Sequence, residues 1–163
     1  MIKCVAIDDE PLALGQIKNY ISKVSFLEHV AEFSSAVDAL RFLTNESVDL
    51  IFVDINMPDL TGIDFVRLLT AQRPMIIFTT AYSEFAIEGF KLDAVDYLLK
   101  PFSFADFSRS ANKALSLFEL IKNSNSSSDS QLMNLHKQVK PLVLQRILSN
   151  LLYHQQSVNK ALL

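Results

Sequence analysis

The stretch Leu50-Ile51-Phe52-Val53-Asp54 decides the fold, because it is a short apolar run that ends in a carboxylate. Short runs rich in Val, Ile and Phe predict buried strands of a parallel sheet. Three further runs end at charged or hydroxyl residues: Ile2-Lys3-Cys4-Val5-Ala6-Ile7 before Asp8-Asp9-Glu10, Met75-Ile76-Ile77-Phe78 before Thr79-Thr80, and Val95-Asp96-Tyr97-Leu98-Leu99 before Lys100-Pro101. Ligands collect at the carboxyl ends of the strands in open parallel sheets. The sequence therefore predicts an acidic pocket that can hold a divalent cation and a phosphoryl group.

Strands and helices are predicted to alternate along residues 1–122. The strands expected after the first are residues 29–33, 49–53, 75–79 and 94–98. The helices are expected after Asp9, after Ser34-Ser35, at residues 62–71 and 83–92, and from Ser103 or Asp106 to about Lys122. Five such units with short connections predict an α/β fold, a doubly wound five-stranded parallel sheet with helices on both faces.

Local signals mark the starts of the first two helices. Pro11 falls in the first turn of one helix, where its missing backbone N–H is harmless, and Ser34-Ser35 can cap the next. The apolar stripe predicted for the first helix consists of Leu12, Leu14, Ile17, Tyr20, Ile21 and Val24. The acids of residues 8–10 have a second interpretation, as stabilisers of the helix start. The position of Asp54 at the end of another central strand favours the pocket.

Composition limits the class of protein. Half of the 163 residues are apolar, enough for one α/β core plus an appendage. No apolar run reaches the roughly 18 residues of a membrane span, and a signal peptide's basic and apolar regions are missing from the N-terminus. The single Cys4 is predicted to be a buried structural thiol, which fits a reducing, cytoplasmic location. Residues 1–122 carry 11 Lys/Arg against 17 Asp/Glu, a balance that disfavours nucleic-acid contact there.

The composition changes after residue 122. Residues 123–130 contain no apolar side chain and predict a flexible Ser/Asn-rich linker. Residues 131–163 predict a helical tail, whose apolar stripe consists of Leu142, Val143, Ile147, Leu148, Leu151 and Leu152. A lone helix of this kind is marginal in water, so its stripe should bury against residues 1–122, a second tail or another protein. The tail is therefore a possible dimerisation or docking element.

The four strand ends together resemble a known family. The motifs are Ile7-Asp8-Asp9-Glu10-Pro11, Val53-Asp54-Ile55-Asn56-Met57-Pro58-Asp59-Leu60-Thr61-Gly62, Thr79-Thr80-Ala81-Tyr82 and Asp96-Tyr97-Leu98-Leu99-Lys100-Pro101-Phe102. In this order and spacing they resemble the receiver domain of bacterial two-component response regulators, over Met1 to about Lys122. The resemblance implies a flavodoxin-like strand order 2-1-3-4-5. It also implies a phosphorylation-dependent switch that receives its phosphoryl group from a sensor histidine kinase.

The resemblance also assigns roles in the pocket. Asp54 is expected to accept the phosphoryl group, because a divalent cation can offset the phosphate charge and align the donor. Mg²⁺ is the implied cofactor, with Asp9 as a direct ligand, Asp8 acting through water, and the backbone carbonyl of Asn56 as a further ligand. Lys100 is expected to reach the phosphoryl oxygens, and the family places a cis peptide between it and Pro101.

The expected switch lies on the last two strands. Thr80 aligns with the hydroxyl that bonds the phosphoryl group in the family, and Thr79 is the neighbouring alternative. Tyr97 aligns with the aromatic residue whose ring turns inward when that hydroxyl moves. The face expected to carry the signal includes Phe85, Ile87, Phe90, Lys91, Leu92, Asp93 and Tyr97. Tyr82 is expected to slow hydrolysis of the acyl phosphate. Gly62 is expected to shape the loop beside Asp54 through a positive φ.

The subfamily and two competing functions complete the prediction. Residues 78–86 and 94–102 resemble LytTR-type regulators, which control transcription through a C-terminal β-rich DNA-binding domain. No β-rich segment follows the linker, so DNA contact is expected only through a domain absent from this chain. A homodimer is expected through the fourth-helix and fifth-strand face or through the tail. The alternatives are a phosphorylation-independent binding module and a Mg²⁺-dependent phosphatase with an Asp nucleophile, which would favour an acid where Asn56 stands.

Overall fold

Five parallel strands form one sheet in the computed structural model, which describes residues 1–69, 73–81 and 92–124. The strands are β1 (Ile2–Ile7), β2 (Leu27–Phe33), β3 (Leu50–Asp54), β4 (Met75–Thr80) and β5 (Asp96–Leu99). Their order is β2-β1-β3-β4-β5, and all neighbours pair in parallel. The predicted fold class and strand order are confirmed. β2 begins two residues earlier than predicted, and β4 includes Thr80.

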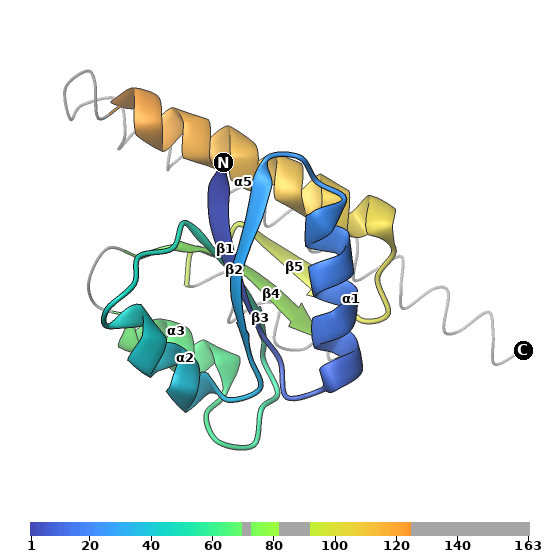
Figure 1. Ribbon diagram of the computed structural model, residues 1–163, viewed down its shortest axis with the longest axis vertical. Coiled ribbons are helices and arrows are strands. Elements are labelled where there is room, and N and C mark those ends of the chain that lie inside the picture. The colour runs from blue at the N-terminus through green and yellow to red at the C-terminus, as the bar shows by residue number, and fades with distance from the viewer. Residues whose placement is uncertain (70–72, 82–91, 125–163) are drawn as a thin grey trace, which may run out of the picture. The chain divides into compact units, whose positions relative to one another are not determined.

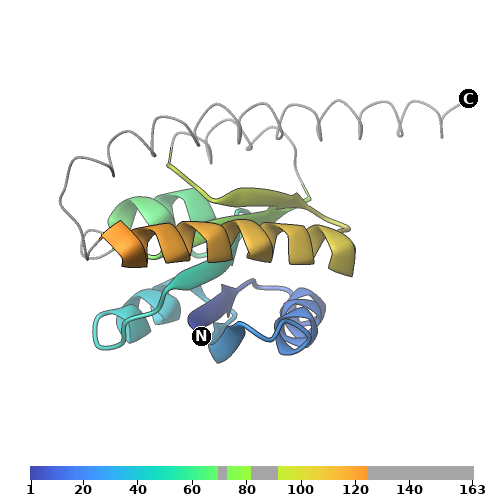
Figure 2. The same cartoon turned by 90° about the horizontal axis from the view of Figure 1, so that it is seen from above.

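Helices cover both faces of the sheet (Figures 1 and 2). They are α1 (Pro11–Ser22), α2 (Ala36–Leu43), α3 (Gly62–Leu68) and α5 (Phe104–Ser124). Figure 2 shows α2 and α3 on the side of the sheet opposite to α1. Because all five strands run parallel, their carboxyl ends meet at one edge of the sheet.

The last described residues include the start of the predicted linker. The chain divides into two compact units, Met1–Leu120 and Ile121–Leu163. α5 continues to Ser124, so the first two residues of the predicted linker are helical. The predicted fourth helix lies outside the described residues apart from Leu92, as do the rest of the linker and the tail. Within the ranges that are described, no helix is long and apolar enough to cross a membrane.

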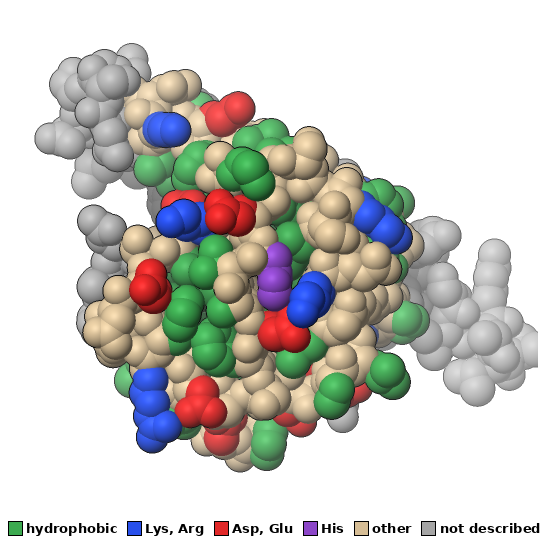
Figure 3. Space-filling view, viewed as in Figure 1, with side chains coloured by type: hydrophobic (Ala, Val, Ile, Leu, Met, Phe, Trp, Pro, Cys, Tyr) green, Lys and Arg blue, Asp and Glu red, His purple; other side chains and the backbone are tan. Residues whose placement is uncertain are grey.

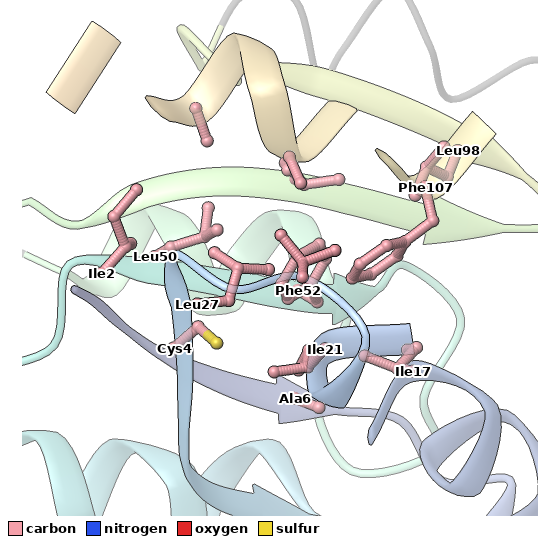
Figure 4. Close-up of a cluster of buried hydrophobic side chains, with 14 of the residues drawn as sticks. Ile2, Cys4, Ala6, Ile17, Ile21, Leu27, Leu50, Phe52, Leu98 and Phe107 are labelled. Atoms are coloured by element: carbon pink, nitrogen blue, oxygen red, sulfur yellow. The ribbon is translucent and has the colours of Figure 1, made fainter. Parts of the chain in front are cut away.

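The core between α1, α5 and the sheet is built from aliphatic and aromatic side chains (Figure 4). Phe107 of α5 is fully buried, and its ring stacks on Phe52 of β3 with centroids 4.9 Å apart. Burying such a side chain stabilises the fold by about 1.5–3 kcal/mol. This packing fixes β3, and therefore Asp54, relative to the last helix.

One residue of the predicted stripe on α1 does not join this core. Leu14, Ile17 and Ile21 face the sheet, whereas Leu12 is 89% exposed. Positions two residues apart on a helix do not share a face, so Leu12 and Leu14 cannot both be buried here. The inclusion of Leu12 in the buried stripe was therefore wrong.

The single cysteine lies in the core. Cys4 is fully buried, its Sγ lies 3.2 Å from the carbonyl oxygen of Glu28, and burial raises the pKa of the thiol to about 12. The thiol is therefore structural, as predicted.

β2 forms one edge of the sheet, where Lys18 pairs with Glu32 at 3.2 Å. Figure 3 shows acidic and basic side chains interspersed on the face that carries β2, an arrangement that discourages edge-to-edge pairing.

Candidate functional site

Three carboxylates meet where β1 and β3 end. Asp8 and Asp9 follow β1, and Asp54 is the last residue of β3. Because β1 and β3 are direct neighbours, one carboxylate oxygen from each of the three residues lies within 4.8 Å of the other two. Asp8 and Asp54 are buried, while Asp9 is half-buried. The structure therefore brings together the acids that the sequence placed at this edge.

Asp8 is held on both of its oxygens. Oδ1 accepts a hydrogen bond of 3.0 Å from the backbone N–H of Glu10, and Oδ2 accepts one of 2.7 Å from Nζ of Lys100. Burial raises the pKa of the Asp8 carboxyl, and the bond from Lys100 opposes that rise. Asp8 is thus a rigid member of the pocket, oriented from both sides.

Lys100 supplies the positive charge of the site. Its Nζ lies 3.3 Å from Oδ1 of Asp54 and 3.7 Å from Oε1 of Glu10. Its backbone N–H donates to the carbonyl of Thr80 at 2.7 Å, and its peptide bond to Pro101 is cis. Burial alone would lower the pKa of Lys100, but the hydrogen bond to Asp8 and the neighbouring carboxylates raise it. The side chain is therefore an ammonium ion aimed at the acids.

The Asp54 carboxylate sits in an unusual electrostatic environment. It is 3% exposed, and burial raises its pKa from 3.8 to about 6. Lys100 opposes the rise, Asp8 adds to it, and a hydrogen bond from the backbone N–H of Asn56 favours the charged form. A buried carboxylate near neutral pH needs compensating positive charge, which Lys100 provides in part.

The donor set fits a hard divalent cation. Mg²⁺ prefers oxygen ligands and binds through one or two carboxylates with waters and phosphate oxygens. The oxygens of Asp8, Asp9 and Asp54 are close enough to share one such ion, and the acids outnumber the single nearby lysine. The site can therefore bind a cation and, with Lys100, an anionic group beside Asp54.

Gly62 shapes the loop beside Asp54 for a different reason than predicted. None of the described glycines has a positive φ, so that expectation was wrong. A Cβ at Gly62 would instead lie 2.2 Å from the carbonyl oxygen of Asp54, and the Gly62 N–H donates to the carbonyl of Ile55 at 2.9 Å. The requirement is close backbone approach, which closes the loop at its base.

The predicted switch residues lie on β4 and β5. Thr80 is buried and pairs in register with Leu99, next to Lys100. Tyr97 is 8% exposed and pairs in register with Phe78. Thr79 pairs with Asp54 across β3 and β4, and its buried Oγ1 has no hydrogen-bond partner among the described residues. Of the predicted signalling face, only Leu92, Asp93 and Tyr97 are among the described residues. Tyr82 lies outside the described residues as well.

Two residues near the site were not predicted to act there. Glu10 reaches Lys100 from the start of α1, although the sequence marked it only as one of three consecutive acids. Asp59, in the loop after β3, accepts a hydrogen bond of 2.7 Å from Oγ of Ser35. The motif that contains Asp59 was recognised, but no sequence pattern pairs that residue with the start of α2.

The fold and the acidic pocket are those of a signalling domain. The chain belongs to the response regulator receiver domain family, whose model matches residues 4–112. This confirms the resemblance drawn from the four strand-end motifs. Receiver domains bind Mg²⁺ at an acidic pocket and interact with sensor histidine kinases.

Individual relatives support the subfamily. The chain is 38% identical over 114 residues to the sensory transduction protein LytR of Staphylococcus haemolyticus, covering 69% of this chain and 44% of LytR. It is 41% identical over 102 residues to the transcriptional regulatory protein BtsR of Escherichia coli, covering 62% of this chain and 43% of BtsR. The resemblance to LytTR-type regulators is thereby confirmed. The chain spans less than half the length of these curated relatives.

A solved structure agrees with this assignment. The response regulatory domain of protein mrkE from Klebsiella pneumoniae is 36% identical, with a TM-score of 0.70. The similarity covers 73% of this chain and 99% of that domain. The isolated receiver domain of RcsB from Salmonella enterica, at 19% identity and a TM-score of 0.61, shares the fold.

Proposed function

We propose that this chain is a phosphorylation-dependent signalling switch that accepts a phosphoryl group from a sensor histidine kinase on Asp54. The observation that carries the proposal is the position of Asp54, buried between two further acids and the ammonium of Lys100. A lone buried carboxylate would have no means to bind an incoming phosphoryl group. Beside this one lie two further carboxylates, which would help hold a cation, and the ammonium of Lys100, at 3.3 Å from Oδ1.

The residues divide the work of phosphoryl transfer. Asp9, Asp54 and the backbone carbonyl of Asn56 would hold Mg²⁺ directly, and Asp8 would act through water. When bound, the ion neutralises phosphate charge and aligns the donor. An oxygen of Asp54 attacks the phosphorus, and the P–N bond to the kinase histidine breaks. The bonding electrons go to the imidazole nitrogen; with a proton on the other ring nitrogen of the phosphohistidine, the ring leaves as neutral imidazole. Lys100 binds the phosphoryl oxygens and offsets their added charge.

The signal would travel along β4 and β5. Phosphorylation adds about 1.5 to 2 negative charges, and new bonds to Lys100 and the Thr80 hydroxyl would pull the end of β4 toward Asp54. Tyr97 would follow on β5 and bias two packings of the face around it. Because Thr80 and Lys100 are already joined by a backbone hydrogen bond of 2.7 Å, both would respond together.

The regulatory effect of the switch would be exerted by a longer protein, like the regulators that the chain resembles. BtsR is a transcriptional regulatory protein, and we propose transcriptional control in a full regulator, in the cytoplasm. Dimerisation would use the face around β5 or the predicted tail, and DNA would be contacted only through a further domain. The family consists of signalling proteins, so any hydrolysis of the acyl phosphate would be a slow side reaction.

Hydrogen exchange tests the switch itself. The chain is incubated with acetyl phosphate and Mg²⁺, and exchange is followed in peptides that contain Thr80 and Tyr97. Altered exchange in the wild type, absent from Asp54→Asn, is the expected result. Unchanged exchange in a fully phosphorylated wild-type chain would favour the phosphorylation-independent binding module.

A further inference from the structure

The loop between β3 and α3 is anchored at both its base and its tip. At the base, the Gly62 N–H donates to the carbonyl of Ile55, and the glycine backbone lies directly against the carbonyl of Asp54. Toward the tip, Asp59 reaches across to the first turn of α2. The intervening Asn56 is the residue whose backbone N–H bonds the Asp54 carboxylate.

The contact at the tip is a complete hydrogen-bond network. Oδ2 of Asp59 accepts from Oγ of Ser35 at 2.7 Å and from the backbone N–H of Val37 at 3.3 Å. Its Oδ1 accepts from the N–H of Leu60 at 2.9 Å. Ser35 is the N-cap of α2, and its Oγ also accepts from the N–H of Asp38 at 3.3 Å. The Ser35 hydroxyl thus donates to the loop and accepts from the helix.

Electrostatics favour the same contact. The free N–H groups and the dipole at a helix start attract negative charge, and the Asp59 carboxylate lies at this position on α2. Burial is the largest single effect and opposes the charged form, but the hydrogen bonds from Ser35, Val37 and Leu60 together outweigh it and lower the pKa of Asp59. The carboxylate is therefore charged at neutral pH, and the tether is a charge-assisted one.

We propose that Asp59 is a positioning residue for the phosphorylation site. By fixing the loop to the start of α2, it holds the backbone of Asn56 beside Asp54 and thereby strengthens Mg²⁺ binding and speeds phosphoryl transfer. Asp59 contacts neither the metal nor the phosphoryl group. The inference rests on the proposed function, since it assumes that Asp54 and the Asn56 carbonyl form the metal site. Groups that orient metal ligands from behind commonly affect affinity without touching the ion.

Titration with Mg²⁺ alone tests the proposal. We expect Asp59→Ala to weaken Mg²⁺ binding by about tenfold, the lower end of the range for such supporting residues. Ser35→Ala removes one of the two bonds from α2 to Asp59 and leaves the one from Val37, so it should weaken Mg²⁺ binding less, and the double variant should bind no more weakly than Asp59→Ala. Asp64→Ala is the matched control. Like Asp59→Ala it removes one negative charge, and like Asp59 the Asp64 carboxylate accepts a hydrogen bond from a helix-capping hydroxyl, that of Thr61 at 2.8 Å. This control should bind Mg²⁺ within about twofold of the wild type, since long-range charge effects are screened by salt.

Amide exchange separates positioning from general stability. In Asp59→Ala, exchange should accelerate within residues 55–61, while the unfolding midpoint changes no more than in Asp64→Ala. Equal Mg²⁺ affinity and equal loop exchange in Asp59→Ala and Asp64→Ala would overturn this inference alone. A wild-type chain that binds no Mg²⁺ would overturn the proposed function and this inference with it.

Discussion

Nζ of Lys100 lies 3.3 Å from Oδ1 of Asp54, although Asp54 ends β3 and Lys100 follows β5, which is not a neighbour of β3 in the sheet. The distance is short enough for a direct ionic interaction, and Asp54 itself is buried. The ammonium therefore opposes the rise in the pKa of Asp54 that burial causes, without cancelling it.

The stability of the chain without Mg²⁺ should depend on the charge of Asp54. Its pKa is raised from 3.8 to about 6, so between these values the folded state binds more protons than the unfolded state. The contribution of Asp54 to the free energy of unfolding therefore falls as pH rises through this window. Asp54→Asn mimics the protonated form and should be more stable at about pH 7.5 by roughly 2–3 kcal/mol, at about 1.36 kcal/mol per pKa unit.

Urea unfolding at two pH values checks this expectation. The advantage of Asp54→Asn should shrink as pH falls through this window and approach zero near about pH 3, where wild-type Asp54 is mostly protonated in both states. Asp38→Asn, at an exposed position on α2, is the control and should show no comparable gain. Equal stability of Asp54→Asn and the wild type at both pH values would contradict the account of Asp54.

Mg²⁺ should stabilise the chain through Asp9. At a concentration one hundred times its dissociation constant, a ligand bound only to the folded state adds about 2.7 kcal/mol to the free energy of unfolding. Asp9→Asn should lose most of this gain, whereas Glu10→Gln, with the same change of charge one residue away, should keep it. Thermal melts with and without Mg²⁺ provide the comparison. A similar loss in both variants would mean that only the overall charge of the segment matters.

Gly62 should tolerate no larger side chain. A methyl group there would overlap the carbonyl oxygen of Asp54 at 2.2 Å, so Gly62→Ala should destabilise the fold by about 3 kcal/mol, as severe overpacking does. Gly15 is the matched control, because a Cβ on this helical glycine meets nothing within 4 Å. Gly15→Ala should stabilise the fold by roughly 0.5–1 kcal/mol, the difference in helix propensity. Equal effects at both glycines would refute the close-approach explanation.

The two adjacent threonines should separate stability from signalling. Thr79 buries a hydroxyl without a hydrogen-bond partner among the described residues, so Thr79→Val should raise the free energy of unfolding by about 1 kcal/mol. It should leave the phosphorylation-dependent change in hydrogen exchange intact. Thr80→Val should still accept a phosphoryl group but lose that change at Tyr97. The opposite pattern would assign the switch to Thr79, the alternative left open by the sequence.

The sequence predicted those features that depend on local pattern. Apolar runs located the five strands, the parallel arrangement brought the acids to one edge, and Pro11 and Ser35 marked two helix starts correctly. The ends of elements were less accurate: β2 begins earlier, at Leu27, which is buried in the core, and α5 continues to Ser124. An exposed Leu12 was also missed, since the stripe was chosen by hydrophobicity rather than by angular position.

Contacts between distant segments were beyond the reach of sequence pattern. The bond between Ser35 and Asp59 joins a helix cap to a loop that follows another strand. Either residue alone has an ordinary local explanation, as a cap or as a turn former. In the same way, the sequence indicated that Gly62 is special but suggested backbone conformation, whereas the cause is the neighbouring carbonyl of Asp54.

Intact mass after incubation with acetyl phosphate and Mg²⁺ tests the central claim most directly. The wild-type chain should gain about 80 Da, the mass of one added phosphoryl group. Asp54→Asn should gain nothing, and removal of Mg²⁺ with a chelator should abolish the gain in the wild type. A wild-type chain without the added mass, under conditions that preserve acyl phosphates, would contradict the assignment of Asp54 as the phosphoryl acceptor.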